Sequence, residues 1–289
     1  MPRSRVLVAG AGGQLGTAVV TAFAGDEIIA HTRATLDITD PEAVRHAVAE
    51  ARPAVVINCA AFNDVDGAED RPADAFAVNA FAVRSLARAA ADAGAVFVHY
   101  GTDFVYDGRT AKAYTEDVPP SPRSAYAMSK LTGEWFALEA PRAYVLRVES
   151  LFGMPRSWTG RRGTLENIAA GLEQGRAVKV FTDRIVTPSY IPDIAAATRH
   201  LISAEAAPGL YHCVNSGQAS WYEVADHLAG ELGVEPRLEP VMTDQVQMKA
   251  VRPRFCALSN RKLAAAGFAM PTWQDAIRRW LATRGRPAA

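Results

Sequence analysis

The sequence has little cysteine and no net charge. Its 289 residues include three cysteines, Cys59, Cys213 and Cys256, which lie far apart and form no CxxC pair. Neither a disulfide framework nor a cysteine metal site is expected, and we predict no metal site elsewhere. The 31 basic residues balance 31 acidic residues. The chain therefore lacks the positive field that binds nucleic acids or anionic membranes, and we expect neither partner.

Long hydrophobic runs are also missing. No apolar stretch approaches the length of about 18 residues that a membrane-spanning helix needs. The first residues, MPRSRVLVAG, lead into a strand pattern without the apolar core of a secretory signal. These features predict a soluble protein of the reducing cytoplasm. The length predicts one large domain, or a core with a smaller appendage.

Short apolar runs alternate with longer helical patterns in the first half of the chain. The runs are typical of buried strands and lie at 5–10, 27–31, 54–60, 95–101 and 143–148. Between the third and fourth runs, DAFAVNAFAVRSLARAAADAG repeats apolar residues at spacings of three and four and ends at Gly94, which predicts a crossover helix. The alternation predicts an α/β fold, a doubly wound parallel sheet of the Rossmann type with helices on both faces.

The pattern changes after about residue 149. A polar loop rich in arginine and glycine, MPRSWTGRRGT, is followed by shorter elements and several prolines. We predict a dinucleotide-binding domain over residues 1–148, to which later segments can return, and a smaller α/β substrate lobe over residues 149–289. No low-complexity linker separates them, so they are expected to pack together. The cleft between them is the expected ligand site.

A glycine-rich segment, GAGGQLG, follows the first predicted strand and precedes a helical pattern. Gly10, Gly13 and Gly16 have the GxxGxxG spacing that lets backbone N–H groups and the positive end of a helix approach a pyrophosphate. The segment predicts a dinucleotide site that includes Gln14 and Leu15. A glycine-rich turn without a ligand is the alternative.

The end of the second strand, AHTRATLD, bears on the choice of cofactor. Sites for NAD usually place a carboxylate there, whereas an arginine accommodates the 2′-phosphate of NADP. Arg33 lies at this end without an adjacent acid, and Asp37 and Ile38 follow where the adenine is expected. We predict NADPH as the preferred cofactor, with NADH possible. A solvated surface role for Arg33 is the alternative.

The segment AYAMSKLTGEWF places Tyr126 and Lys130 four residues apart, on one face of a predicted helix. An ammonium group about 4 Å from a phenol favours the phenolate. Lys130 is therefore expected to lower the pKa of Tyr126 into the working range of a proton donor. Thr102 and Asp103 end the fourth strand, where open α/β sheets bind ligands. The alternative is a tyrosine packed in the core beside a solvated lysine.

These segments resemble the extended short-chain dehydrogenase/reductases, and among them the dTDP-4-dehydrorhamnose reductases, over nearly the whole chain. The matching segments are GAGGQLG, LDITDPEAV, VVINCAAFNDVDGAED, AVNAFAVRSLARAA, VHYGTDFVYDG, YAMSK, GLYHCVNSG, SWYEVA, RPRFCALSNRKL and PTWQDAI. The resemblance implies an NADPH-dependent reductase of a nucleotide-linked 4-keto-6-deoxysugar. Two alternatives stay open: another nucleotide-sugar reductase or epimerase, and a non-catalytic NADP-binding regulatory subunit similar to that of methionine adenosyltransferase.

The resemblance also implies roles for individual residues. Thr102, Tyr126 and Lys130 correspond to the catalytic trio: the tyrosine donates a proton, the lysine holds the nicotinamide ribose and the threonine holds the substrate oxygen. Asp103 is expected to contact the sugar. Asn79 is expected to be structural, because buried helix amides commonly pair with neighbouring backbone. Further cofactor contacts are implied for Ala60, Ala61, Phe62 and Tyr100.

Candidates for binding the rest of the substrate lie in the second lobe. Arg184 and Arg252 are candidates for the diphosphate, since guanidinium groups suit phosphate oxygens, although a surface ion pair is the alternative for each. Trp221 and Tyr222 are candidates for stacking on the base, with packing in the lobe as the alternative.

One segment departs from the family pattern. After the fifth strand the family commonly has RTSWVYG, whose tryptophan faces the sugar, whereas this chain has RVESLFG. Ser150 occupies the tryptophan position and is predicted to contact the sugar while leaving room for a larger or more polar one. Glu149 precedes it, with burial and pairing to Arg147 or another neighbour as the alternative to a role in the pocket.

The chain also lacks the carboxylates of a known type of assembly. Some bacterial members of the resembled family are dimers joined through magnesium held by glutamates. The corresponding positions here are Ala18 and Pro192, neither of which offers a ligand to a hard cation. We predict no magnesium-bridged dimer and leave the oligomeric state open.

Overall fold

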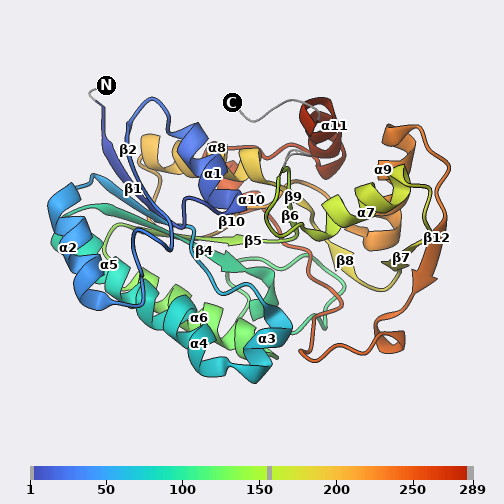
Figure 1. The fold of residues 1–289 in the computed structure, drawn as a ribbon, viewed down its shortest axis with the longest axis horizontal. Helices are drawn as coiled ribbons and strands as arrows, with labels where there is room; N and C mark the ends of the chain where they lie inside the picture. The colour runs from blue at the N-terminus through green and yellow to red at the C-terminus, as the bar shows by residue number, and fades with distance from the viewer. Residues whose placement is uncertain (1–2, 155–157, 285–289) are drawn as a thin grey trace.

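The computed structural model describes residues 3–154 and 158–284. A six-stranded parallel sheet in the order β10-β5-β4-β3-β1-β2 forms its centre (Figure 1). The predicted α/β class and parallel sheet are therefore confirmed. The strands are β1 (Arg5–Ala9), β2 (Glu27–His31), β3 (Val55–Asn58), β4 (Val96–Thr102), β5 (Ala143–Val148) and β10 (Gly209–His212).

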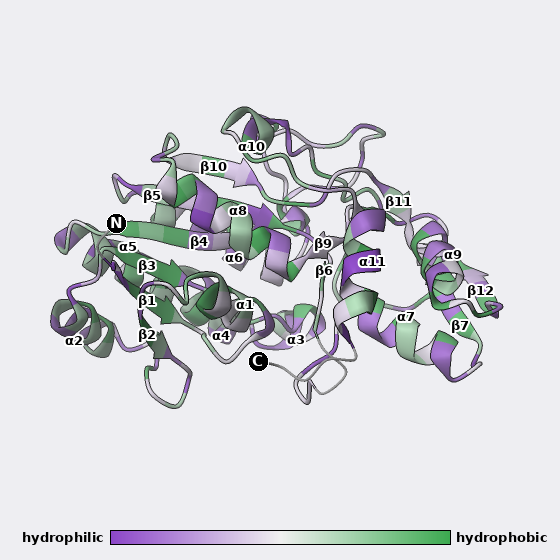
Figure 2. Cartoon of the chain, turned by 90° about the horizontal axis from the view of Figure 1, so that it is seen from above, coloured by the Kyte–Doolittle hydropathy of each residue, from purple (hydrophilic) through white to green (hydrophobic). Residues whose placement is uncertain are grey.

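Helices cover both faces of this sheet (Figure 1). One face is covered by α1 (Gln14–Ala22) and α8 (Ile191–Ser203), and the other by α2 (Pro41–Ala51), α5 (Ala82–Asp92) and α6 (Ala125–Leu138). Strands covered on both faces are expected to be apolar along their whole length. Figure 2 shows strands β1, β3 and β4 in the colour of hydrophobic residues. None of the helices in the described ranges is long and apolar enough to cross a membrane.

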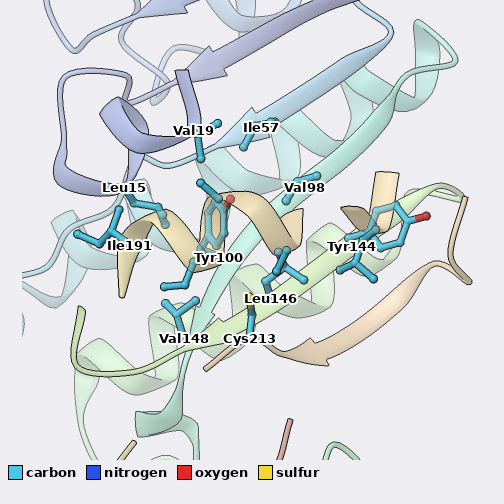
Figure 3. Packing of buried hydrophobic residues seen from close by; sticks show 14 of the residues in the cluster. Leu15, Val19, Ile57, Val98, Tyr100, Tyr144, Leu146, Val148, Ile191 and Cys213 are labelled. Carbon is cyan, nitrogen blue, oxygen red and sulfur yellow. The ribbon is translucent and has the colours of Figure 1, made fainter. Parts of the chain in front are cut away.

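The core under α1 and α8 joins the first half of the chain to the second. Leu15 and Val19 of α1 and Ile191 of α8 pack over Val98 of β4 and Leu146 of β5 (Figure 3). All five side chains are at least nine-tenths buried. Burying each contributes about 1.5–3 kcal/mol, so this contact fixes the glycine loop at the start of α1 against the sheet.

The predicted crossover helix forms with an irregularity in its middle. It consists of α4 (Pro72–Phe76), a π-helical turn η1 (Ala77–Phe81) and α5, which ends at Asp92. Gly94 follows with a φ of +66°. Turns of the π type mostly occur singly within helices, often at functional sites. Here Gly133 of α6 allows close approach, because a Cβ there would collide with the carbonyl oxygen of Asn79.

The second lobe is built from short paired strands and three helices. The pairs are β6 (Leu151–Phe152) with β9 (Ser189–Tyr190), β7 (Val178–Phe181) with β12 (Leu238–Val241), and β8 (Ile185–Val186) with β11 (Ala219–Ser220). Helices α7 (Thr164–Glu173), α9 (Trp221–Leu232) and α11 (Trp273–Arg284) surround a separate core. The remaining elements are α3 (Val65–Asp70), η2 (Asp103–Val105), η3 (Thr243–Gln245) and α10 (Arg261–Ala265).

Two elements from the second half of the chain are part of the sheet domain. Strand β10 pairs with β5, and α8 packs on α1. The sheet therefore includes residues from beyond 148, as the predicted division allowed, while the boundary between residues 148 and 149 stays a prediction.

Candidate active site

A cleft of about 810 Å³ lies at the carboxyl ends of the sheet strands and is closed by residues of the second lobe. Most of the predicted site residues line it: Gly13, Gln14, Leu15, Ala60, Ala61, Tyr100, Thr102, Asp103, Tyr126, Lys130, Ser150, Arg184 and Arg252. The other predicted residues are not among those that line it: Gly10, Gly16, Phe62, Arg33, Asp37 and Ile38. Segments distant in sequence therefore meet at one site.

The glycine loop lies between β1 and α1 and has little room for side chains. Gly10 has a φ of +77°, and a Cβ there would lie 2.6 Å from the backbone nitrogen of Ala60. A Cβ on Gly16 would collide with the carbonyl oxygen of Gly10. These two glycines do not line the cleft, but their lack of a side chain lets the loop pack closely against the end of β3 and against α1. Helix α1 begins at Gln14 with no acidic side chain in its first turn, so its positive end is available to an anion.

The residues predicted to read the cofactor's adenosine half lie beyond the lining of the cleft. Arg33 is exposed in the turn after β2. Asp37 accepts bonds from the amide and hydroxyl of Thr39, which lower its pKa, as does the charge of Arg33 to a smaller extent. Ile38 is buried in the core. Their roles toward the cofactor stay predictions.

Tyr126 and Lys130 lie one turn apart on α6. Ser124 caps this helix by accepting a bond from the amide of Ala127. Both site residues are buried, and the Lys130 ammonium donates to the carbonyl oxygen of Tyr100 over 2.5 Å. The predicted placement on one helix face is therefore correct, and the lysine is held beneath the cleft rather than in solvent.

The predicted pKa of Tyr126 differs from the structure. Burial, and next the charge of Asp103, raise the pKa of Tyr126 well above its usual value of 10, against the smaller lowering effect of a bond with Thr102. The expected lowering by Lys130 is not among the causes of this shift, and the Lys130 ammonium donates to the backbone carbonyl of Tyr100. Tyr126 consequently holds its proton at neutral pH, which is the state that a proton donor requires.

Lys130 is a buried cation whose charge is only partly compensated. Burial lowers its pKa to about 8, and the carboxylate of Glu134, one turn along α6, acts in the opposite direction. Glu134 itself is bound by the guanidinium of Arg147 at 2.7 Å. The lysine therefore carries its charge at neutral pH and loses it in mildly alkaline solution.

Thr102 and Asp103 follow one another at the tip of β4. The hydroxyl of Thr102 donates to Asp103 over 3.2 Å and accepts from the amide of Phe104 at 3.3 Å. Burial raises the pKa of Asp103 to about 6, against weaker lowering by Cys256, Thr102 and Arg184. The tip thus presents a hydroxyl and a carboxyl beside Tyr126.

Glu149 is buried, but it is not paired with Arg147. Its Oε2 accepts from the amide of Thr187 at 2.7 Å and from the Thr187 hydroxyl, whereas Arg147 pairs with Glu134. Of the two kinds of partner given in the alternative, Arg147 or another neighbour, the structure shows the second, because Thr187 comes from a later segment of the second lobe. Ser150 follows with a φ of +44° and lines the cleft.

The two candidate arginines differ in their present partners. Arg252 forms two bonds to Asp66, at 3.0 and 2.8 Å. It therefore forms the ion pair that was given as the alternative to diphosphate binding. The guanidinium of Arg184 lies over the ring of Phe181 at 5.4 Å, and its buried Nε has no hydrogen-bond partner among the residues described. Both side chains line the cleft.

Comparison with known proteins identifies the family. The profile of the RmlD substrate-binding domain family matches residues 4–285. This chain belongs to that family. It is 37% identical to a dTDP-4-dehydrorhamnose reductase of Streptomyces griseus, covering 97% of this chain and 92% of the relative. It is 34% identical to the spore coat polysaccharide biosynthesis protein SpsK of Bacillus subtilis, covering 97% and 98%.

Solved structures agree with this RmlD family assignment. A dTDP-4-dehydrorhamnose reductase of Bacillus anthracis in complex with NADP superposes with a TM-score of 0.91 at 29% identity, covering 97% of this chain and 99% of that one. The resemblance to extended short-chain dehydrogenase/reductases is thereby confirmed.

Several cleft residues were not predicted from the sequence. The loop of the second lobe contributes Trp158, Arg161 and Arg162, and residues 155–157 of the same MPRSWTGRRGT segment lie outside the described residues. Gln14 donates to the carbonyl of Arg161 at 2.7 Å, and Arg161 donates to the carbonyl of Asn63 at 3.3 Å. The loop thus bridges both sides of the cleft. Its density of arginine and glycine was the available signal.

The two aromatic candidates and Asn79 have clear positions. Trp221 is buried in the core of the lobe and also lines the cleft, whereas Tyr222 is exposed and is not among the lining residues.

Asn79 accepts from the amide of Phe62 at 2.8 Å and donates to its carbonyl at 3.1 Å and to Ser129 at 3.0 Å. This agrees with the predicted structural role, since Asn79 ties the loop after β3 to α6.

Proposed function

We propose that this RmlD-family protein is an NADPH-dependent reductase of a nucleotide-linked 4-keto-6-deoxysugar. The similarity to dTDP-4-dehydrorhamnose reductases, one of them solved with NADP, bears out the predicted oxidoreductase class, the cofactor and this reaction type. The observation that carries the proposal is the convergence of Thr102, Tyr126 and Lys130 in the cleft that also receives the glycine loop.

The residues of the glycine loop fit a dinucleotide. The absence of side chains at Gly10 and Gly16 lets the loop lie close to β3, and the amide groups at the start of α1 face the cleft. Such amides bind the pyrophosphate of a dinucleotide. Bound NADPH supplies the hydride for the carbonyl carbon. Ala60, Ala61 and Tyr100 form the wall along which the cofactor is proposed to lie.

The catalytic trio supplies the proton and the orientation. Tyr126, which keeps its proton at neutral pH, donates it to the carbonyl oxygen as the hydride reaches the carbon. Thr102 positions that oxygen with its hydroxyl. Lys130 is a cation below pH about 8 and is proposed to hold the nicotinamide ribose of the cofactor with its ammonium group.

Substrate binding is assigned to the second lobe and the tip of β4. Arg184, whose Nε is free of a hydrogen-bond partner in the described residues, is proposed to bind a diphosphate oxygen. Arg252 joins it by giving up or sharing its bonds with Asp66. Asp103 and Ser150 are proposed to contact the sugar.

We also propose a cytoplasmic location. The described cysteines Cys59, Cys213 and Cys256 are all free thiols, as is usual in a reducing compartment. For assembly, Ala18 of α1 is half-buried and Pro192 lies in the first turn of α8. A dimer bridged by magnesium through these positions is not part of the proposal.

A panel of dTDP-, UDP- and GDP-linked 4-keto-6-deoxysugars, assayed for NADPH oxidation, tests the proposal. The expected result is turnover of at least one sugar with formation of a hydroxyl at C4. Tight NADPH binding without oxidation on any sugar would contradict it and favour a regulatory subunit. Conversion of a sugar without net consumption of NADPH would instead indicate an epimerase.

A further inference from the structure

Two buried carboxyl groups face each other at the floor of the cleft. Asp103 is at the tip of β4 and Glu149 follows β5, the neighbouring strand, and their side chains are 4% and 2% exposed. An oxygen of each lies within 4.8 Å of the other. Both residues also line the cleft that holds Thr102 and Tyr126. They are therefore placed to meet a ligand, and not merely to fill the core.

Each carboxyl group has one oxygen held by the protein and one left for another partner. Glu149 Oε2 is held by the amide and hydroxyl of Thr187, whereas the only partner of its Oε1 within the described part of the chain is the hydroxyl of Ser150, at 3.5 Å. Asp103 Oδ1 accepts from Thr102, whereas its Oδ2 is buried without a partner among the described residues. A buried oxygen of this kind is costly unless something binds it.

The surrounding charges favour one proton on the pair. The groups that face it are the guanidinium of Arg184, the thiol of Cys256 and the phenol of Tyr126, which keeps its proton. Burial raises the pKa of both carboxyl groups, and the charge of Asp103 further raises that of Glu149. Two carboxylates this close share a proton when a single cation faces them.

A metal ion is the less favourable occupant. Cys256 completes a group of three potential ligand atoms with the two carboxyl groups, all within 4.8 Å. However, the charge of Arg184 acts on all three groups, and it would repel a divalent cation placed between them. A proton adds one charge rather than two and needs no change of ligand geometry.

We propose that Asp103 and Glu149 hold one proton between them and bind a substrate hydroxyl next to the reacting carbonyl, which makes the protein selective for keto sugars that carry this hydroxyl. This inference rests on the proposed reductase function. A neutral carboxyl group donates a hydrogen bond and an ionised one accepts a hydrogen bond. A hydroxyl does both, so the pair matches it and leaves a deoxy position unmatched.

The position of the pair indicates which hydroxyl it reads. Asp103 is bonded to Thr102, the residue assigned to the carbonyl oxygen. A group bound by the pair therefore lies beside that oxygen, on the carbon adjacent to the ketone. Glu149 replaces the serine of the RTSWVYG pattern, so this chain has a second carboxyl group where the family pattern has a hydroxyl.

The selectivity is tested with two nucleotide-linked 4-keto-6-deoxysugars that differ only in the hydroxyl at C3. We expect wild-type kcat/KM to favour the hydroxyl sugar by about 10²-fold or more, because the deoxy sugar leaves buried polar groups unpaired. Glu149→Gln should reduce this ratio about 10-fold. The control Glu116→Gln alters a part-buried carboxylate that does not line the cleft, and it should leave the ratio unchanged. Equal kcat/KM values for the two sugars in the wild type would overturn the proposal.

The shared proton is tested without turnover. Carboxyl ¹³C NMR of the whole protein, titrated from about pH 4 to about pH 9, should show a protonated carboxyl group at pH about 7. That signal should be absent in Glu149→Gln, where Asp103 ionises alone beside Arg184. Two ionised carboxylates at neutral pH would refute the pair. If no sugar of the dTDP-, UDP- and GDP-linked panel is reduced, the proposed reductase function fails, and the NMR titration still decides whether the pair holds a proton.

Discussion

The ammonium group of Lys130 donates to the backbone carbonyl of Tyr100 across 2.5 Å and so ties α6 to the tip of β4. The bond explains how a charged side chain that is 3% exposed can be kept at the floor of the cleft. It also orients the lysine toward the wall on which the cofactor is proposed to lie. Burial disfavours the charged form of Lys130 and lowers its pKa to about 8.

Catalysis should therefore decline in mildly alkaline solution. Since the proposed contact with the cofactor ribose needs the ammonium form of Lys130, we expect kcat/KM to fall about tenfold per pH unit above pH about 8. The profile of kcat/KM reports groups of the free enzyme, and it is measured by NADPH oxidation at constant ionic strength. Lys130→Arg keeps its positive charge, so any activity that it retains should decline only at higher pH than in the wild type. A flat wild-type profile to pH about 10 would contradict this role.

The glycine loop should tolerate a methyl group at one position and not at another. A Cβ at Gly16 meets backbone atoms of Gly10 and Ala11, whereas a Cβ at Gly12 meets only the side chain of Thr32 at 3.4 Å. We expect Gly16→Ala to lose about 1–3 kcal/mol of unfolding free energy and to weaken NADPH binding. Gly12→Ala is the matched control for stability and should leave the free energy of unfolding nearly unchanged. Urea denaturation of both variants measures the difference.

The preference for NADPH should depend on Arg33. Losing a charge-assisted contact to the 2′-phosphate costs about 1.5–3 kcal/mol, which corresponds to roughly 10- to 150-fold in Kd. We expect Arg33→Ala to weaken NADPH by this factor and to leave NADH unchanged. The control Arg45→Ala removes another exposed arginine, on α2, that pairs with Glu42. Equal wild-type affinities for the two cofactors would show that Arg33 does not read the phosphate.

The local parts of this fold could be predicted from the sequence. Five of the six sheet strands coincide with the short, mainly apolar runs predicted from the sequence, and the runs at 27–31 and 143–148 match β2 and β5 at both ends. Spacing alone placed Tyr126 and Lys130 on one helix face. Such features depend on neighbouring residues, whose pattern the sequence displays directly.

Long-range features could not be predicted in the same way. Strand β10 is four residues long and joins the sheet beside β5 after sixty intervening residues. A short apolar run does not indicate which strand it pairs with. The pairing of Glu149 with Thr187 is likewise set by how the lobe folds back. The pKa of Tyr126 was predicted in the wrong direction because the sequence shows the nearby lysine but not the burial of the phenol.

Glu149 should make the stability of the protein depend on pH. Its pKa is raised in the folded state, so the folded protein binds more protons than the unfolded chain above pH about 4.3. Stability is thus lost as pH rises from that value through the folded pKa. Glu149→Gln removes the loss, so its Tm relative to wild type should increase from pH about 4 to pH about 8.

The control variant, Glu223→Gln, should show the opposite dependence of Tm on pH. Bonds from Ser220 lower the pKa of Glu223, so its contribution is present above pH about 4.3 and is lost as pH falls through the folded pKa. Glu223→Gln should accordingly lose Tm relative to wild type at neutral pH and approach wild type in acid. A Tm difference for Glu149→Gln that is constant with pH would show that Glu149 has the same pKa in the folded and unfolded states.

The kcat of Tyr126→Phe on the preferred keto sugar tests the central claim most directly. Loss of the proton donor should reduce kcat about 10²- to 10⁴-fold at saturating substrate, with chemistry shown to be rate-limiting and NADPH still bound. Tyr211→Phe is the matched control, because the Tyr211 hydroxyl donates to the carbonyl of Ala207 and Tyr211 is not among the residues that line the cleft. It should retain wild-type kcat. A Tyr126→Phe protein that keeps more than about a third of wild-type kcat would contradict the account.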